Sequence, residues 1–175
     1  MPTIKDEKAT STHVADTLLV RPIRAAYLDE VRSRGLDYLG NPVQVTAADG
    51  EGEPLRCCLR YARAGEAIML ISYSPDGQGV WREVGPVYVH AESCPGPTHI
   101  SLPDQLRTGP LVLRAYRPDG SMNYEQNTLV PRDQDLEGDL RRLLCRPDVR
   151  HVHVRTLLPQ CFLYSVTMRL RFLHW

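Results

Sequence analysis

Short segments in which apolar and polar side chains alternate limit most strongly what this chain can fold into. The clearest is residues 149–155, and residues 111–116 and 87–90 show the same alternation. Residues two apart share one face of a strand, so each segment predicts a strand with one apolar face. Turn residues, and not helices, separate most of these segments.

Only two segments carry a helical pattern. Pro22 begins one that Gly35 ends, and Asp133 is expected to cap the other, which continues to Leu144. Several strands joined largely by turns, with about two helices, predict an α+β fold. We expect an antiparallel or mixed β-sheet with the helices packed on one side.

The length of 175 residues fits one domain with a substantial core. The polar residues 1–16 predict a disordered N-terminal arm, and residues 17–175 a single α+β domain. Residues 56–62 and 67–73 flank a short connection that contains glycine, which predicts a β-hairpin.

The charge balance narrows the range of partners. The 21 basic and 21 acidic side chains cancel, so the chain lacks the broad positive field that attracts nucleic acid or an anionic membrane. No apolar run approaches the roughly 20 residues that span a bilayer. We therefore expect neither nucleic acid nor a membrane as a partner.

The five cysteines argue against a disulfide framework, because their number is odd and no signal-peptide pattern precedes them. We expect a cytoplasmic protein with reduced thiols.

Three of the predicted strands carry imidazole, guanidinium and phenol groups on the face opposite their small apolar residues. If the strands share one sheet, these groups converge on a cleft; in the alternative interpretation they form a solvated face. The side chains concerned are Tyr88, His90, Arg114, Tyr116, His151, His153 and Arg155.

The first functional hypothesis is a small-molecule enzyme or binder with this histidine-rich site. Arg114 and Arg155 would hold an anionic ligand, with Tyr88 and Tyr116 beside it. His90 and His153 would be the catalytic residues, as general acid or base near neutral pH.

The second hypothesis is a metalloprotein that binds zinc or iron. His151 and His153 present two imidazoles from one strand, and His90 with Cys94 offers further ligands. Cys57, Cys58 and Cys161 are additional candidates. No CxxC pair is present, and adjacent cysteines on a strand, as predicted for Cys57 and Cys58, would point to opposite faces.

Two other interpretations stay open. Cys94 or Cys161 near His90 or His153 could form a nucleophilic thiolate–imidazolium pair. Alternatively, the chain is a non-catalytic interaction module that uses a sheet edge or residues 172–175, and that forms a homodimer. The chain contains no GxSxG, P-loop, GxGxxG or HExxH motif, which disfavours the enzyme classes that use them.

Four groups of residues in a fixed order resemble a family of small bacterial proteins catalogued as domain of unknown function 1203. They are Pro54-Leu55-Arg56-Cys57-Cys58-Leu59, Gly85-Pro86-Val87-Tyr88-Val89-His90-Ala91 with Cys94, Leu113-Arg114-Ala115-Tyr116, and His151-Val152-His153-Val154-Arg155 with Cys161. The resemblance runs from about Leu18 to Val166 and implies no particular activity, cofactor or catalytic residue. Members of the family commonly have glycine where this chain has Gln160, which predicts a rebuilt turn at that position.

Overall fold

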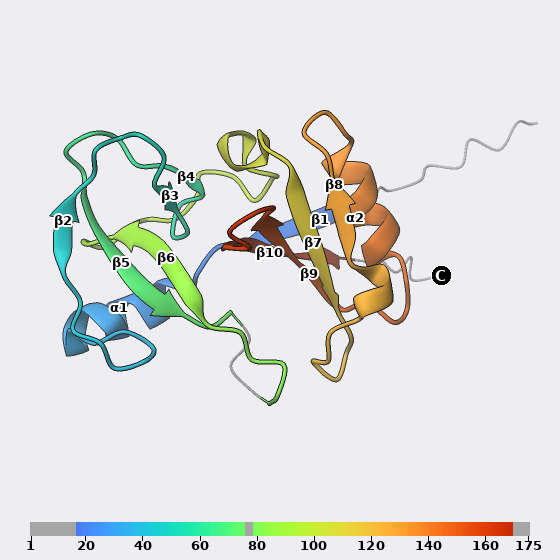
Figure 1. Cartoon of the computed structure of the whole chain (residues 1–175), viewed down its shortest axis with the longest axis horizontal. Helices are drawn as coiled ribbons and strands as arrows, with labels where there is room; N and C mark the ends of the chain where they lie inside the picture. Colours follow the sequence, from blue (N-terminus) through green and yellow to red (C-terminus); the bar gives the residue numbers. More distant parts are fainter. Residues whose placement is uncertain (1–16, 76–78, 170–175) are drawn as a thin grey trace, which may run out of the picture.

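The computed structural model describes residues 17–75 and 79–169, which form two five-stranded sheets and two α-helices (Figure 1). The α+β class with antiparallel or mixed strands is confirmed, and the strands divide into two sheets. In spatial order the first sheet, which is antiparallel throughout, consists of β1 (Thr17–Arg21), β10 (Phe162–Arg169), β9 (His151–Thr156), β7 (Leu111–Tyr116) and β8 (Thr128–Val130).

The second sheet is mixed. Its strands, in spatial order, are β2 (Val45–Ala47), β5 (Ala67–Tyr73), β6 (Gly85–His90), β3 (Pro54–Leu55) and β4 (Arg60–Tyr61). Only the β3–β6 pair is parallel among the described strands of this sheet. Two short 3-10 helices, Asp104–Arg107 and Tyr124–Gln126, lie in the connections on either side of β7.

Helix α2 (Leu136–Leu144) covers the apolar face of the first sheet. Its leucines 136, 140, 143 and 144 are buried in one cluster with strand residues such as Val152 and Val166. Asp135, and not the expected Asp133, caps this helix, because its carboxylate accepts a hydrogen bond from the Gly138 N–H at 3.0 Å.

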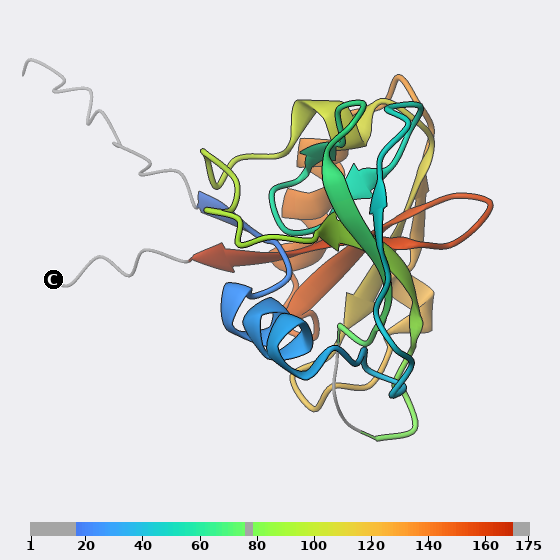
Figure 2. The ribbon, with the colours of Figure 1, turned by 90° about the vertical axis from the view of Figure 1, so that its left-hand side faces the viewer.

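Helix α1 (Ala25–Arg34) packs on the second sheet, at the other end of the long axis of the molecule (Figures 1 and 2). Leu28 and Val31 are buried against strand residues such as Ile71. Gly35 ends the helix as predicted, with φ 65° and its N–H bonded to the carbonyl of Val31. No helix among the described residues is long and apolar enough to cross a membrane.

The two halves of the molecule, each made of one sheet and the helix packed on it, exchange side chains where they meet. Phe162 of β10 is buried in the apolar cluster of the second sheet, and Leu59 is buried in that of the first. The buried guanidinium of Arg56 donates a 2.8 Å hydrogen bond from Nε to the Phe162 carbonyl. This bond joins the turn after β3 to the first sheet.

The hairpin predicted for residues 56–62 and 67–73 is wrong. Strand β4 pairs with β3, whereas β5 pairs with β2 and β6. Residues 56–59 form the turn between β3 and β4, which is closed by a 2.8 Å hydrogen bond from the Leu59 N–H to the Leu55 carbonyl. Leu59 adopts φ 61°, a left-handed conformation that is rare for leucine and that the sequence therefore does not predict.

Candidate metal centre

Two of the three strands with a polar face are neighbours, and the third is not. Strands β7 and β9 pair so that Arg114 lies opposite His153 and Tyr116 opposite His151. Strand β6, which carries Tyr88 and His90, pairs with β5 and β3 in the other sheet. The condition for one shared cleft, that all three strands lie in one sheet, is therefore not met, and the seven polar side chains divide between two places.

The histidines of β9 belong to an aromatic cluster. The rings of Tyr116 and His151 stack with centroids 4.9 Å apart and an interplanar angle of 5°. The ring centroid of His153 lies 4.4 Å from that of Tyr116 and 5.1 Å from that of Phe162. The exposed fraction of His153 is 1%. His153 is thus packed into the protein interior between aromatic rings, whereas His151 is half-buried.

Arg114 and Arg155, the predicted anion-binding pair, both contact the carboxylate of Glu83. The Tyr116 hydroxyl donates to the same carboxylate at 3.0 Å. Burial, followed by the charge of Arg155, lowers the pKa of Arg114. Within the described structure these groups therefore hold a carboxylate of the protein itself, and their binding of an external anion stays a prediction. Nothing in the sequence singled out Glu83.

Gln160 keeps the backbone conformation for which glycine is suited. Its φ is 56°, and its side-chain oxygen accepts a 3.0 Å hydrogen bond from Arg114 while its amide donates to the Leu157 carbonyl. The turn before β10 is thus left-handed without a glycine, and side-chain hydrogen bonds accompany the strained backbone.

A second group of ionisable side chains lies at one edge of the second sheet. Cys57 and Cys58 come from the turn between β3 and β4, His90 ends β6, and Cys94 lies in the loop that follows. One ligand atom from each residue lies within 4.8 Å of the ligand atoms of the other three. The expectation that Cys57 and Cys58 point to opposite faces is wrong, because they occupy a turn and not a strand.

His90 is held from both sides of its ring. Its Nδ1 lies 3.3 Å from Cys57 Sγ and 3.8 Å from Cys58 Sγ. Its Nε2 lies 3.2 Å from a guanidinium nitrogen of Arg60 and 3.7 Å from a carboxylate oxygen of Glu66. Arg60 and Glu66 form an ion pair at 2.7 Å, so a charged pair sits behind the imidazole.

The thiols are electrostatically coupled. A hydrogen bond from the Cys58 thiol lowers the pKa of Cys57, and the backbone N–H of His90, which donates to Cys57 Sγ at 3.4 Å, acts in the same direction. The same thiol–thiol hydrogen bond, with burial, raises the pKa of Cys58, and burial raises that of Cys94. These interactions make Cys57 the most acidic of the three thiols.

Three thiols and one imidazole are a common ligand set for tetrahedral zinc. Ligand atoms at roughly 2.0–2.3 Å from such an ion stand about 3.6–3.8 Å apart, close to the observed sulfur–nitrogen distances of 3.3 and 3.8 Å. The cluster includes the predicted ligands His90 and Cys94. His151 and His153 lie in the first sheet, and Cys161 is also outside the cluster.

Comparison with known proteins gives a family and no relative of assigned function. A family model described as "Protein of unknown function (DUF1203)" matches residues 52–168, a range that contains all four residues of the cluster. No curated protein and no solved structure matches the chain. Since the family model covers well over half of the sequence, the chain belongs to the DUF1203 family.

Proposed function

We propose that this protein binds a zinc ion through Cys57, Cys58, His90 and Cys94. The observation that carries the proposal is the approach of four ligand atoms, from three separate segments, to within 4.8 Å of one another. Thiolate and imidazole ligands suit zinc, whereas an iron–sulfur cluster is usually held by four cysteines. Zinc is therefore a better match than iron for three cysteines and one histidine.

Four protein ligands complete a tetrahedral shell, which is typical of a structural zinc site and not of a catalytic one. With Nδ1 toward the ion, Nε2 of His90 carries the proton and faces the Arg60–Glu66 ion pair, in which the Glu66 carboxylate, at 3.7 Å, is the group that would accept it and orient the ring. The zinc would tie the turn between β3 and β4 to the end of β6 and to the next loop. In this role it stabilises the edge of the second sheet.

Metal analysis of protein purified without an affinity tag tests the proposal. We expect about one equivalent of zinc per chain, filling the four-ligand site formed by these described residues, and its loss in Cys58→Ser and Cys94→Ser. Cys145→Ser is the matched control, because Cys145 is an exposed cysteine outside the cluster, and this variant should keep its zinc.

Cobalt substitution keeps the test valid if a cysteine variant fails to fold. Co²⁺ bound to the intact protein should give the intense absorption of tetrahedral thiolate coordination, and zinc should displace it. Protein that neither retains zinc on purification nor binds Zn²⁺ or Co²⁺ when reduced and titrated would overturn the proposal.

A further inference from the structure

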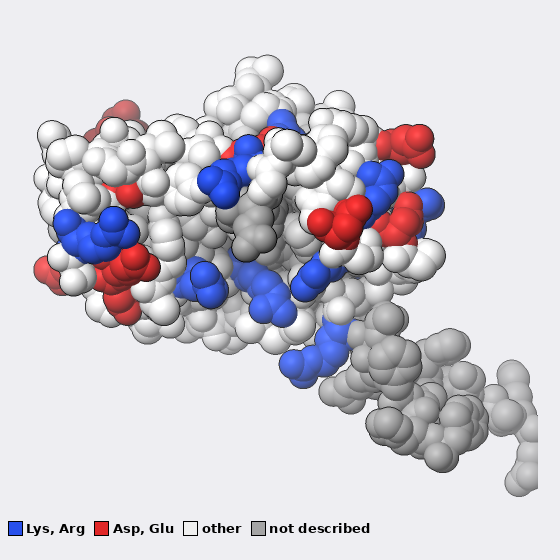
Figure 3. Space-filling view, turned by 90° about the horizontal axis from the view of Figure 1, so that it is seen from below, with Lys and Arg blue, Asp and Glu red and all other residues white. Residues whose placement is uncertain are grey.

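A basic cavity lies on the polar face of the first sheet, apart from the cysteine cluster. Its volume is about 930 Å³, and strands β1, β9 and β10 and the loop after β7 contribute to its wall. Arginine side chains follow one another across the middle of this side of the molecule, while acidic ones gather mainly toward its ends (Figure 3). The cavity therefore has a positively charged wall in a protein with no net charge.

Arg21 and Arg150 supply the charge that faces the cavity. Arg21 donates from Nε to the Thr167 hydroxyl at 3.2 Å, and Arg150 donates to the Pro118 carbonyl at 3.3 Å. Within residues 17–75 and 79–169 neither guanidinium has a carboxylate partner at salt-bridge distance. Each keeps further N–H donors for a ligand.

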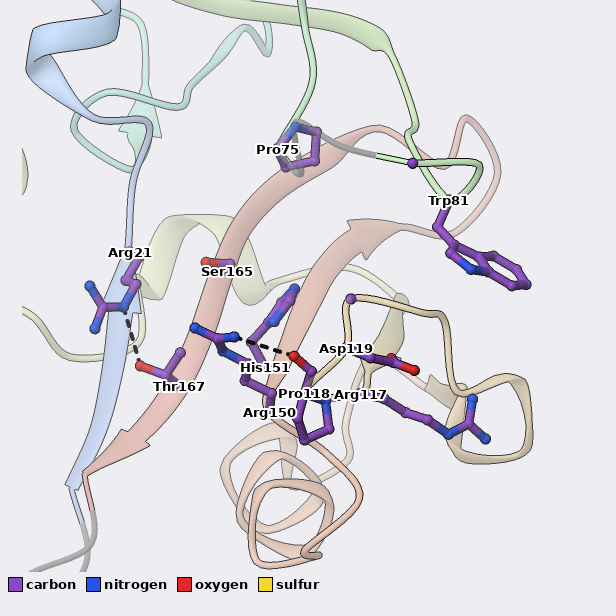
Figure 4. A pocket seen from close by; sticks show the side chains of 12 residues that line it. Arg21, Pro75, Trp81, Arg117, Pro118, Asp119, Arg150, His151, Ser165 and Thr167 are labelled. Carbon is purple, nitrogen blue, oxygen red and sulfur yellow. Dashed lines mark hydrogen bonds between the residues drawn. The ribbon is translucent and has the colours of Figure 1, made fainter.

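The other charged side chains of the wall are already engaged. Arg117 is turned away from Arg21 and Arg150 (Figure 4) and donates to the Met122 carbonyl and the Asn123 side chain, both at 2.9 Å. Asp119 accepts hydrogen bonds from the backbone and the hydroxyl of Ser121 at 2.9 and 2.7 Å. Among the described residues of this wall, one locally bonded carboxylate thus opposes the two guanidiniums.

The strand register places hydroxyl groups between the two arginines. Arg21 of β1 lies opposite Ser165 of β10, and Thr167 is two residues farther along, so the three side chains share one face. Thr167 lies between Arg21 and Arg150 in Figure 4, with Ser165 above it. His151, which stacks on Tyr116 at 4.9 Å, completes this wall with a fixed ring.

We propose that Arg21, Arg150, Ser165 and Thr167 bind the phosphate group of a small molecule. Guanidinium forks from two sides, with hydroxyl donors between them, match a tetrahedral oxyanion that carries several acceptor oxygens better than they match a planar carboxylate. Arg21 and Ser165 also line a neighbouring cavity of about 510 Å³, which gives room for the rest of the molecule and extends to Cys57 and Cys94. None of the four proposed phosphate-binding residues is a proposed zinc ligand, so the phosphate site does not depend on the zinc proposal.

Titration of the full chain with inorganic phosphate, followed by amide chemical shifts in NMR, tests the site. Sodium chloride at matched ionic strength serves as the blank. We expect saturable shifts centred on His151, Ser165 and Thr167. Arg21→Gln and Arg150→Gln should each raise the dissociation constant for phosphate by about tenfold, as expected when one charged hydrogen-bond partner is lost.

Arg142→Gln is the matched control, because Arg142 is an exposed arginine of α2 on the opposite face of the sheet, and its phosphate affinity should equal that of the parent. Unchanged spectra elsewhere in Arg21→Gln and Arg150→Gln would show that both remain folded. The proposal is overturned by shifts that do not saturate, by equal losses in all three variants, or by acetate producing the same shifts as phosphate.

Discussion

The two sheets hold their ionisable side chains in different ways. In the first sheet, Arg114, Tyr116, His153 and Arg155 project from regular strands and contact one another, Glu83 or aromatic rings. In the second sheet, the cysteine–histidine cluster lies in a turn, at a strand end and in a loop. The first group is joined by contacts within the protein, whereas the second brings together four groups that share an affinity for one metal ion.

This difference shows that a face rich in histidine and arginine is not by itself a binding site. The strand positions of the first sheet become a packed network because Glu83 supplies the opposite charge and Phe162 supplies a ring against His153. In the second sheet, Cys57 and Cys58 lie in a turn that brings their side chains together, whereas in a regular strand they would point to opposite faces. Four tests can break or sharpen this contrast.

The largest expected effect comes from removing the carboxylate of the first network. Glu83→Ala leaves two neighbouring arginines, with Arg155 only 8% exposed, without the charge that joins them. We expect a loss of roughly 2–4 kcal/mol in the free energy of unfolding, less than for a fully buried pair because Glu83 is partly exposed. Urea denaturation measures it, with the exposed residue Glu51 changed to alanine as control. A loss in Glu83→Ala below about 1 kcal/mol would mean that the network is solvated.

A chelator should affect the second sheet selectively if the zinc proposal holds. Removal of the ion frees the turn at residues 56–59, so its amides should exchange about a hundredfold faster, which corresponds to about 2.7 kcal/mol of local stability. Amides of β9 and β10 should keep their rates within about threefold. Hydrogen exchange with mass spectrometry measures both regions, and equal acceleration in the two sheets would contradict a local role for the metal.

A smaller effect is expected at the start of α2, on the first sheet. Asp135→Ala removes the acceptor for the Gly138 N–H and should lower the free energy of unfolding by about 1 kcal/mol. Asp133→Ala, two residues earlier and exposed, should change it by less than about 0.5 kcal/mol. Thermal or urea unfolding measures both losses. A larger loss in Asp133→Ala than in Asp135→Ala would mean that Asp133, and not Asp135, caps the helix.

The smallest expected effect is a pH dependence of the free energy of unfolding that arises from Asp37, which lies beside the second sheet. Burial alone would raise the pKa of Asp37, but hydrogen bonds from Ser72 and Asn41 outweigh it and hold this pKa well below its usual value. Because the folded pKa is depressed, the stabilisation is complete above about pH 5 and is lost progressively as the pH falls through the unfolded value, about 3.9, toward the folded value. Asp37→Asn should therefore show a shallower loss of stability than the parent between about pH 5 and pH 3.

Urea midpoints at several pH values measure this slope, with Asp133→Asn as an exposed control that should follow the parent. Parallel acid profiles for Asp37→Asn and the parent would show that Asp37 does not contribute.

Much of the local structure could be predicted because it depends on neighbouring residues. Alternation along residues 111–116 and 149–155 predicted one apolar face for each strand, and Leu111, Leu113, Val152 and Val154 are buried in one cluster with the leucines of α2. Gly35 ends α1 as its conformational freedom predicts. His90 and Cys94 were among the predicted metal ligands and lie together.

Other features could not be predicted because they depend on contacts distant in sequence. The turn that aligns the thiols of Cys57 and Cys58 includes Leu59 in a left-handed conformation, which leucine does not signal. His90 meets those thiols because β6 runs parallel to β3, a pairing between segments about thirty residues apart.

The sequence by itself determined which side chains share a strand face, where α1 stops and that the fold is α+β, since these follow from backbone geometry and short-range periodicity. Only the tertiary structure decided which strands became neighbours, that Glu83 joins Arg114 to Arg155, and that three cysteines and a histidine meet. The physical reason is that strand pairing and charge pairing are selected by the free energy of the whole packed chain, which no local pattern contains.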